Sequence, residues 1–296
     1  MNRRDFARMM AGGAVTTAAL PVSASLWHGG SSETAAIPFG LSVMLWIFRD
    51  LPFEQCLENV AEAGYRAAEL VHEFEKWSDQ DIRHVNAKKR SLGISFDATA
   101  GVWKGVADPA ARQAFLADLE KLLVVADKLE CPGVIVLSGD RIDGLSPMAQ
   151  HQSSIETLKR AADIASKRKV TLLLENIDPE ENPRYYLTSV AEGFEIIRAV
   201  DHPHVKFLYD FYHEQIAEGN LIEKLEKNIP QVGLVHIADV PGRHEPGSGE
   251  INYANIFRKL AELNYQRYAA MEYIPVGDPV VSLRATREML VSSLRK

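Results

Sequence analysis

Four ionisable residues in the second half of the sequence each follow directly on an apolar run. They are Glu175, Asp210, His236 and Glu272. A carboxylate that closes a buried apolar run is costly unless a cation or a hydrogen bond compensates for it. Three carboxylates and one imidazole make an oxygen-dominated ligand set, which suits Mg²⁺ or Mn²⁺ best and also accepts Co²⁺ or Zn²⁺. Each residue alone could be a helix cap or an ion-pair partner, but together they predict a divalent-metal site.

Other polar residues lie close in sequence to these four. Glu181, His213 and Arg243 could reach the same site from loops. The planar guanidinium of Arg243 matches a substrate carboxylate in bidentate fashion. For Glu181 and His213 the alternative is a solvated loop face. A further group, which could shape a small pocket or simply pack in the core, consists of Trp46, Glu69, His72 and Trp103.

The four residues need a scaffold that brings them together. From residue 38 onward, short apolar runs without clear alternation recur, which is typical of strands buried on both faces of a parallel sheet. Eight runs are present: Phe39–Leu45, Ala67–Val71, Ile94–Thr99, Val134–Leu137, Val170–Leu174, Val205–Tyr209, Leu234–Ile237 and Tyr268–Met271. In a barrel, active-site residues lie at the C-terminal ends of the strands, where all four candidates fall.

Amphipathic segments between the runs predict helices. The segments are Phe53–Ala63, a helix opening at Asp108-Pro109, Ser153–Ser166, Ser189–Val200, Leu221–Asn228, Ala254–Leu263 and Val281–Leu294. Alternating strands and helices over this length predict a single (β/α)8 TIM barrel of class α/β across residues 38–296. No dinucleotide-binding glycine fingerprint follows the first run, which disfavours an open doubly wound sheet.

The N-terminus predicts export. Residues 1–24 hold paired arginines, Arg3 and Arg4, then an uncharged apolar stretch and small residues in cleavage positions. This layout resembles a twin-arginine signal peptide and implies a periplasmic or otherwise exported protein. The alternative is a short disordered or amphipathic leader on a cytoplasmic protein. The apolar stretch is too short for a stable membrane anchor, and residues 25–37 have the composition of a linker.

The net charge and the two cysteines further limit the class of protein and the kind of site. The net charge is −7, which gives no electrostatic support for a nucleic-acid partner. Cys56 and Cys131 have no metal or redox spacing. We expect both to be buried free thiols, although two cysteines in an oxidising compartment could also pair. The composition is also compatible with a homo-oligomer.

Around the predicted ligands the sequence resembles the hydroxypyruvate isomerase branch of the xylose-isomerase-like barrel superfamily. The resemblance rests on residues 209–215 and 236–253, with the Pro-Gly-Arg-His-Glu-Pro-Gly run at 241–247, and on Glu272-Tyr273. It implies a metal held by Glu175, Asp210, His236 and Glu272, with the two glutamates as acid and base. It also implies substrate contacts from Glu181, His213 and Arg243.

Two segments depart from that resemblance. The isomerases carry Glu-Pro-Ile-Asn where this chain has Glu175, Asn176, Ile177 and Asp178, and they tend to carry lysine at the position of Ile274. Both segments border the predicted site, so they bear on which substrate fits.

The predicted reaction is an aldose–ketose-type isomerisation such as hydroxypyruvate to tartronate semialdehyde. It requires removal of a proton from carbon and stabilisation of an enediolate, which a metal and a pair of glutamates can supply. The same ligands would serve a ketose or keto-sugar 3-epimerase, or a sugar lyase or dehydratase. A non-catalytic sugar-binding protein of the cell envelope would keep the barrel without needing the metal.

Overall fold

The computed structural model describes residues 37–49 and 51–295 of the chain. Eight parallel strands close into a barrel in sequence order. The strands are β1 (Gly40–Met44), β2 (Ala67–Leu70), β3 (Ser95–Thr99), β4 (Gly133–Leu137), β5 (Thr171–Glu175), β6 (Val205–Asp210), β7 (Val232–Ile237) and β8 (Tyr268–Met271). The predicted TIM barrel is therefore confirmed. The predicted signal peptide and the linker up to residue 36 lie outside the described residues.

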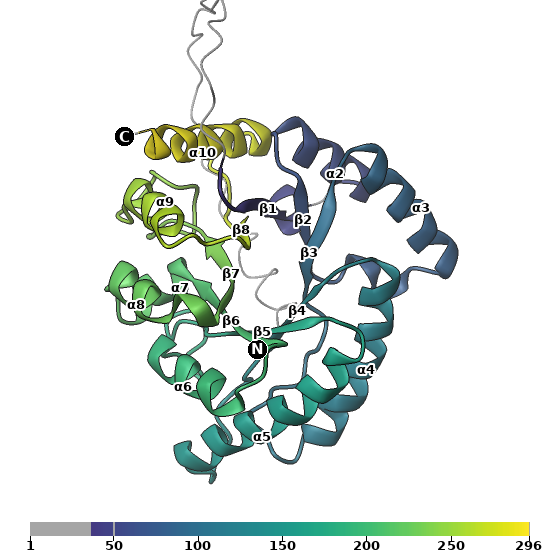
Figure 1. Cartoon of the computed structure of the whole chain (residues 1–296), viewed down its shortest axis with the longest axis vertical. Coiled ribbons are helices and arrows are strands. Elements are labelled where there is room, and N and C mark those ends of the chain that lie inside the picture. The colour runs from purple at the N-terminus through teal and green to yellow at the C-terminus, as the bar shows by residue number, and fades with distance from the viewer. Residues whose placement is uncertain (1–36, 50, 296) are drawn as a thin grey trace, which may run out of the picture. The chain divides into compact units, whose positions relative to one another are not determined.

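Helices surround the barrel on its outer face (Figure 1). The α-helices are α2 (Phe53–Glu62), α3 (Asp79–Ser91), α4 (Arg112–Lys128), α5 (Pro147–Ser166), α6 (Val190–Val200), α7 (Phe211–Ala217), α8 (Leu221–Asn228), α9 (Tyr253–Glu262) and α10 (Pro279–Leu294). Short 3₁₀ helices are η1 (Leu45–Phe48), η2 (Glu73–Lys76) and η3 (Ile229–Gln231). Within the described residues, no helix combines the length and apolar character that a membrane crossing needs.

Four helical segments differ from the prediction, and the first is α5, which begins at Pro147 instead of at Ser153. The helix expected to open at Asp108-Pro109 begins at Arg112 instead, because Asp108 closes a separate turn by accepting the backbone N–H of Ala110. Helix α3 was not predicted because it is very polar, although Ser78 caps it and exchanges hydrogen bonds with Asp81. The short helix α7 was also missed, since it follows β6 without an intervening loop.

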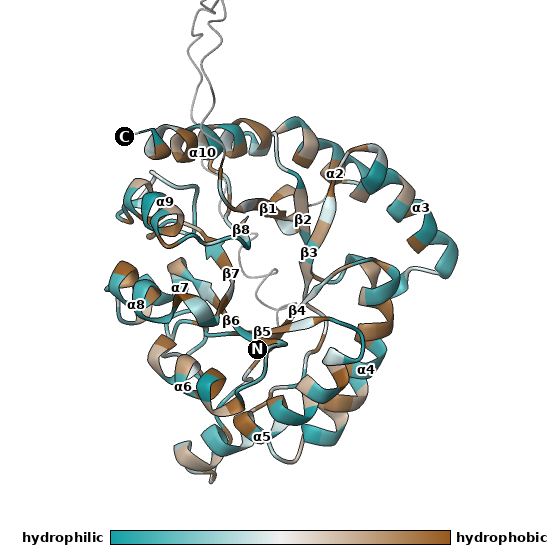
Figure 2. Ribbon diagram, viewed as in Figure 1, coloured by the Kyte–Doolittle hydropathy of each residue, from teal (hydrophilic) through white to brown (hydrophobic). Residues whose placement is uncertain are grey.

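The hydrophobic core has two layers. The larger layer lies between the strands and the apolar faces of the helices, which turn toward the barrel in Figure 2. A smaller cluster fills the barrel interior and consists of Met44, Val71, Ala98, Ala100, Ile135, Leu173, Leu208, Leu234 and Ala270. Because side chains alternate along a strand, a residue two positions from one of these also points inward. The interior cluster thus identifies which strand residues can meet inside the barrel.

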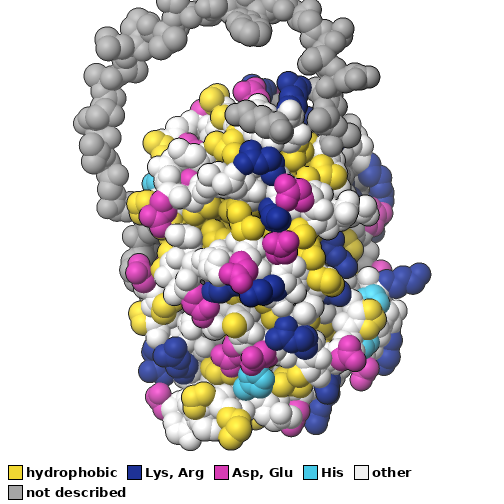
Figure 3. All heavy atoms as spheres, turned by 60° about the vertical axis from the view of Figure 1, so that its left-hand side comes forward, with side chains coloured by type: hydrophobic (Ala, Val, Ile, Leu, Met, Phe, Trp, Pro, Cys, Tyr) yellow, Lys and Arg dark blue, Asp and Glu magenta, His cyan; other side chains and the backbone are white. Residues whose placement is uncertain are grey.

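The outer surface carries charges of both signs. Figure 3 shows acidic and basic side chains interspersed over one face of the molecule. Several of them pair along a helix, as Lys227 does with Glu223 and Lys259 with Glu262. Both cysteines, Cys56 and Cys131, are buried free thiols, as predicted.

Candidate metal centre and active site

The alternation of the strands brings the four predicted ligands to one place. Each lies two positions after a residue of the interior cluster: Glu175 after Leu173, Asp210 after Leu208, His236 after Leu234 and Glu272 after Ala270. The register aligns them across the sheet, since Asp210 on β6 is the direct partner of His236 on β7. All four therefore point inward at the C-terminal end of the barrel.

The four side chains form a compact, water-excluded cluster. One ligand atom from each lies within 4.8 Å of the others. All four residues are buried, the most exposed being Glu272 at 5%. Three carboxylates at this separation would repel one another strongly in a low-dielectric interior. Such an arrangement needs positive charge at its centre or edge.

Arg243 supplies part of that charge. Its Nη2 lies 2.9 Å from Glu272 Oε2 and 3.4 Å from Asp210 Oδ2. Burial raises the pKa of Asp210 above its ordinary value, although His213 and Arg243 oppose that effect. A single guanidinium cannot balance three carboxylates. The cluster therefore fits a divalent cation, because its donors are mostly oxygens, it is deeply buried and its negative charge is only partly balanced.

His236 presents its two ring nitrogens to different partners. Nε2 lies 3.0 Å from Oε2 of Glu69 on β2. Nδ1 lies 2.6 Å from Glu272 Oε2. Burial alone would lower the pKa of His236, but the Glu69 and Glu272 carboxylates outweigh it and raise that pKa well above its usual range. Burial raises the pKa of Glu69 to about 7, against the opposing effect of His236.

Arg243 also connects the metal-ligand cluster to the predicted substrate contacts. Its Nη1 lies 3.3 Å from Oε2 of Glu181, whose other oxygen accepts a 2.8 Å hydrogen bond from Tyr212. The guanidinium stacks over the rings of Tyr212 and Trp46, at 5.0 and 5.8 Å from their centroids. The structure thus places Glu181, Arg243 and Trp46 beside the cluster, and Glu181 is not on a solvated loop face.

His213 is buried and held by two carboxylates. Its Nδ1 lies 2.6 Å from Asp178 Oδ2, and its Nε2 lies 3.4 Å from Asp210 Oδ2. Asp178 Oδ1 accepts the backbone N–H groups of Glu180 and Glu181. The ligand atoms of Asp178, Glu181 and His213 also lie within 4.8 Å of one another. Because these contacts already occupy their oxygens, the group acts as a hydrogen-bonded frame beside the first cluster.

The loop that carries Arg243 depends on Asp239, which the sequence analysis did not single out. The Asp239 carboxylate accepts four backbone N–H groups, those of Val240, Gly247, Gly249 and Ile251, at 2.9–3.0 Å. A Cβ at Gly249 would lie 2.0 Å from the Val240 carbonyl oxygen. Gly249 therefore permits a close backbone contact, and Asp239 fixes the loop around it.

Three further residues that were noted in the sequence are His72, Trp103 and Ile274. His72 is exposed, and the side chain of Trp103 is 49% exposed. Ile274 meets the Arg243 loop through its backbone, donating its N–H to the Arg243 carbonyl and accepting from His244 Nδ1. This contact could not be predicted from the sequence, because Ile274 and the Arg243 loop lie far apart along the chain.

Asn176 occupies an unusual position beside the ligand Glu175. It is fully buried, and neither polar atom of its side chain has a hydrogen-bond partner among the described residues. In the sequence it marks the departure from the Glu-Pro-Ile-Asn pattern. This amide therefore makes no hydrogen bond to the cluster of Glu175, Asp210, His236 and Glu272.

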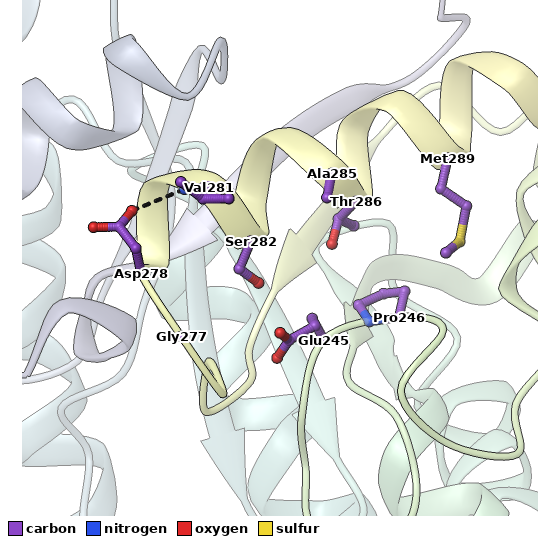
Figure 4. Close-up of a pocket in the computed structure, with 9 residues that line it drawn as sticks. All are labelled: Glu245, Pro246, Gly277, Asp278, Val281, Ser282, Ala285, Thr286 and Met289. Atoms are coloured by element: carbon purple, nitrogen blue, oxygen red, sulfur yellow. Dashed lines mark hydrogen bonds between the residues drawn. The ribbon is translucent and has the colours of Figure 1, made fainter. Parts of the chain in front are cut away.

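A separate pocket lies on the outside of the barrel, along α10 (Figure 4). It encloses about 230 Å³ between α10 and the loops that hold Glu245 and Gly277. Its hydroxyl groups, from Ser282 and Thr286, both contact Tyr273. It brings no cluster of metal-ligating side chains together, so the strand-end cluster remains the candidate site.

The fold and the cluster together define the class of protein. Residues 57–292 match the family model described as xylose isomerase-like TIM barrel, and the chain belongs to that family. The match covers the strands that carry the four predicted ligands.

Individual relatives are named isomerases. The chain is 32% identical to the 2-oxo-tetronate isomerase of Haemophilus influenzae over 80% of its own length and 93% of the relative. It is 28% identical to the hydroxypyruvate isomerase of Escherichia coli, covering 80% and 94% of the two chains. These names confirm the predicted enzyme class, an isomerase.

A solved structure agrees with the fold. A protein from Brucella melitensis described as an AP endonuclease of family 2 superposes with a TM-score of 0.77 at 26% identity. The superposition covers 84% of this chain and 99% of the other. It supports a single barrel that spans the described residues.

Proposed function

We propose that this chain is a divalent-metal-dependent isomerase of short hydroxylated 2-oxo acids, such as hydroxypyruvate, which it would convert to tartronate semialdehyde. The observation that carries the proposal is the convergence of two buried glutamates and an imidazole on one point beside Arg243. The chain's similarity to isomerases of hydroxypyruvate and 2-oxo-tetronate supports the same substrate class.

The residues divide into a metal-holding group and a substrate-holding group. Glu175, Asp210, His236 and Glu272 would hold the cation, most suitably Mg²⁺ or Mn²⁺. When bound, that cation would polarise the carbonyl and offset the negative charge of an enediolate. The burial of the cluster excludes water and strengthens each electrostatic contact inside it.

Proton transfer falls to the two glutamates. One removes a proton from the hydroxymethyl carbon of hydroxypyruvate, and the electron pair moves toward the carbonyl to give an enediolate. A proton then returns to the former carbonyl carbon, while the hydroxyl proton moves from the terminal oxygen to the former carbonyl oxygen, which leaves an aldehyde at the other end. Glu175 and Glu272 share these roles because both carboxylates belong to the cluster.

Arg243 and His213 would orient the substrate. A guanidinium pairs with a carboxylate through two parallel N–H groups, which suits the acid end of the substrate. His213 Nε2 faces Asp210 at 3.4 Å and is the nitrogen that Asp178 leaves available. Glu181 would contact a substrate hydroxyl from the other side of Arg243.

An isotope experiment tests the proposed reaction. The metal-loaded protein is incubated in D2O with hydroxypyruvate, 2-oxo-tetronate, ketoses and keto-sugars, and NMR follows product and deuterium. We expect tartronate semialdehyde deuterated at the former carbonyl carbon, and no reaction after chelation. Inversion of a ketose without carbonyl migration would instead identify a 3-epimerase, and loss of water would identify a dehydratase. Turnover unaffected by chelation would contradict the proposed metal dependence.

We further propose that residues 1–24 export the folded enzyme. The paired arginines Arg3 and Arg4 before an uncharged apolar stretch support this. Fractionation of a bacterial host that expresses the full chain would test it. Replacement of both arginines by lysine should retain the protein in the cytoplasm, whereas an unchanged distribution would contradict export by this route.

A further inference from the structure

We propose that Glu69 is a positioning residue, which fixes the His236 ring so that Nδ1 faces the metal ligands. This inference rests on the proposed metal dependence and adds a residue to which neither the sequence pattern nor the relatives assign a role. Glu69 does not belong to the four-residue cluster, and it reaches His236 from the opposite part of the barrel.

The hydrogen bond between the two residues determines which nitrogen keeps the proton. Glu69 Oε2 lies 3.0 Å from His236 Nε2, and both side chains are fully buried. In the ion pair with the His236 ring, the Glu69 carboxylate is the acceptor and Nε2 is the donor. When the ring gives up its other proton to bind a cation, the proton kept on Nε2 leaves Nδ1 as the nitrogen that provides the lone pair.

The position of Nδ1 agrees with this assignment of the proton to Nε2. Nδ1 lies 2.6 Å from Glu272 Oε2 and 3.5 Å from Glu175 Oε1, between two of the predicted metal ligands. A nitrogen so placed, with the ring fixed from behind, is prepared to bind a cation held by the same carboxylates.

The place of Glu69 in the barrel argues against a role in packing alone. Glu69 lies on β2, two positions before Val71, so it shares the inward face with the interior cluster. Its Oε1 has no hydrogen-bond partner among the described residues. A buried carboxylate with one unsatisfied oxygen costs stability, whereas an apolar side chain of similar size would fill the same space. The hydrogen bond to His236 gives a reason for a buried carboxylate at position 69 despite its cost in stability.

Outer partners of metal-binding histidines typically change metal affinity by about 10- to 100-fold when they are removed. We therefore expect Glu69→Leu to weaken Mn²⁺ binding by that factor, as measured by electron paramagnetic resonance of the free ion. Glu69→Gln retains an acceptor oxygen at the same distance, so it should recover most of the affinity. Circular dichroism and thermal melts of the metal-free variants check that the barrel still folds.

Asp97→Asn provides a matched control. Asp97 is another buried carboxylate of the barrel, but it accepts its 2.5 Å hydrogen bond from Ser42 and makes none to His236. If only the loss of a negative charge mattered, Asp97→Asn and Glu69→Gln would weaken Mn²⁺ binding alike. We expect the Asp97 variant to stay within about twofold of wild type, because Asp97 acts on His236 only through its charge and not through a hydrogen bond.

The tautomer itself is observable by NMR. In the Zn²⁺-loaded protein with ¹⁵N-labelled histidine, we expect the His236 proton on Nε2 and the metal on Nδ1. Metal on Nε2, or unchanged Mn²⁺ affinity in Glu69→Leu, would overturn the positioning role while leaving the metal site intact. Absence of Mn²⁺ binding by the wild type would overturn the proposed function and this inference together.

Discussion

Asp178 Oδ2 lies 2.6 Å from His213 Nδ1, and both side chains are buried. The carboxylate fixes the proton of the imidazole on Nδ1 and orients Nε2 toward the cluster. Asp178 occupies the position where the resembling isomerases carry asparagine. This chain therefore holds its predicted substrate-contacting histidine with a charged partner.

That contact predicts the effect of replacing Asp178. Asp178→Ala should lower kcat/KM by about 100-fold or more, because the ring is free to adopt the wrong tautomer. Asp178→Asn retains one acceptor oxygen and should lose about tenfold or less. Steady-state kinetics with hydroxypyruvate would measure both. Equal losses in the two variants would contradict a role for tautomer control.

The two glutamates of the cluster predict a second result. Glu272→Gln and Glu175→Gln should each lower kcat by at least about a thousandfold, because each removes a proposed metal ligand that is also a proposed proton-transfer group. Retained solubility and circular dichroism would show that the barrel folds. Deuterium exchange at the substrate carbon is the direct measurement. An active Glu272→Gln variant would refute the assignment.

Removal of metal should affect stability as well as activity. The cluster concentrates three carboxylates in a buried volume, so chelation should lower the Tm. Re-addition of Mn²⁺ at about 100 times its Kd should restore about 3 kcal/mol through binding to the native state alone. Differential scanning calorimetry with EDTA and then Mn²⁺ would test this. An identical Tm in both conditions would argue that no cation binds at the cluster.

Loop geometry predicts a contrast between two glycines. Gly249→Ala introduces a Cβ 2.0 Å from the Val240 carbonyl oxygen, so the loop that carries Arg243 must shift. We expect KM for hydroxypyruvate to rise at least about tenfold, since a displacement near 1 Å can cost a hundredfold in rate. Gly277→Ala is the matched control, because no atom lies within 4 Å of its added Cβ. Similar kinetics in both variants would show that the loop position is unimportant.

Glu214 predicts a dependence of stability on pH. Burial raises the pKa of Glu214 to about 7 against the opposing effect of Lys224, while the unfolded value is near 4.5. The folded state therefore holds a proton that the unfolded state loses. This contribution to stability is complete below about pH 4.5 and is lost as pH rises to 7, at most about 3 kcal/mol.

Glu214→Gln removes that proton linkage. Relative to wild type, the free energy of unfolding of the variant should rise between pH 4.5 and 8. Urea denaturation of the metal-free proteins at several pH values would measure the difference. A constant difference across this range would contradict the raised pKa.

The strand ends were predictable from sequence because a polar residue directly after an apolar run is a local signal. It located Glu175, Asp210, His236 and Glu272 without any knowledge of the register. Glu69 was noticed only as a residue near the barrel mouth. Its contact with His236 crosses 167 positions of sequence, and only the closure of the barrel creates it.

Other misses have equally physical causes. Helix α3 has too few apolar residues for a clear periodicity, so only its cap at Ser78 could have revealed it. Asp239 follows a strand as the four ligands do, yet its carboxylate folds back onto its own loop. The position of an acidic residue after a strand does not show whether its carboxylate points into the barrel or back onto its own loop. The direction of the side chain decides between them.

The barrel interior is unequally divided between polar and apolar residues. Ser42, Glu69 and Asp97 come from β1 to β3, whereas the inward residues of β5 to β7 begin with Leu173, Leu208 and Leu234 before the ligands appear. These polar residues share the interior with Met44, Val71 and Ala98, so the larger layer between strands and helices contributes more of the hydrophobic burial. Selection for thermostability alone would therefore favour an apolar residue in place of Glu69, and it would remove the contact that holds the His236 ring.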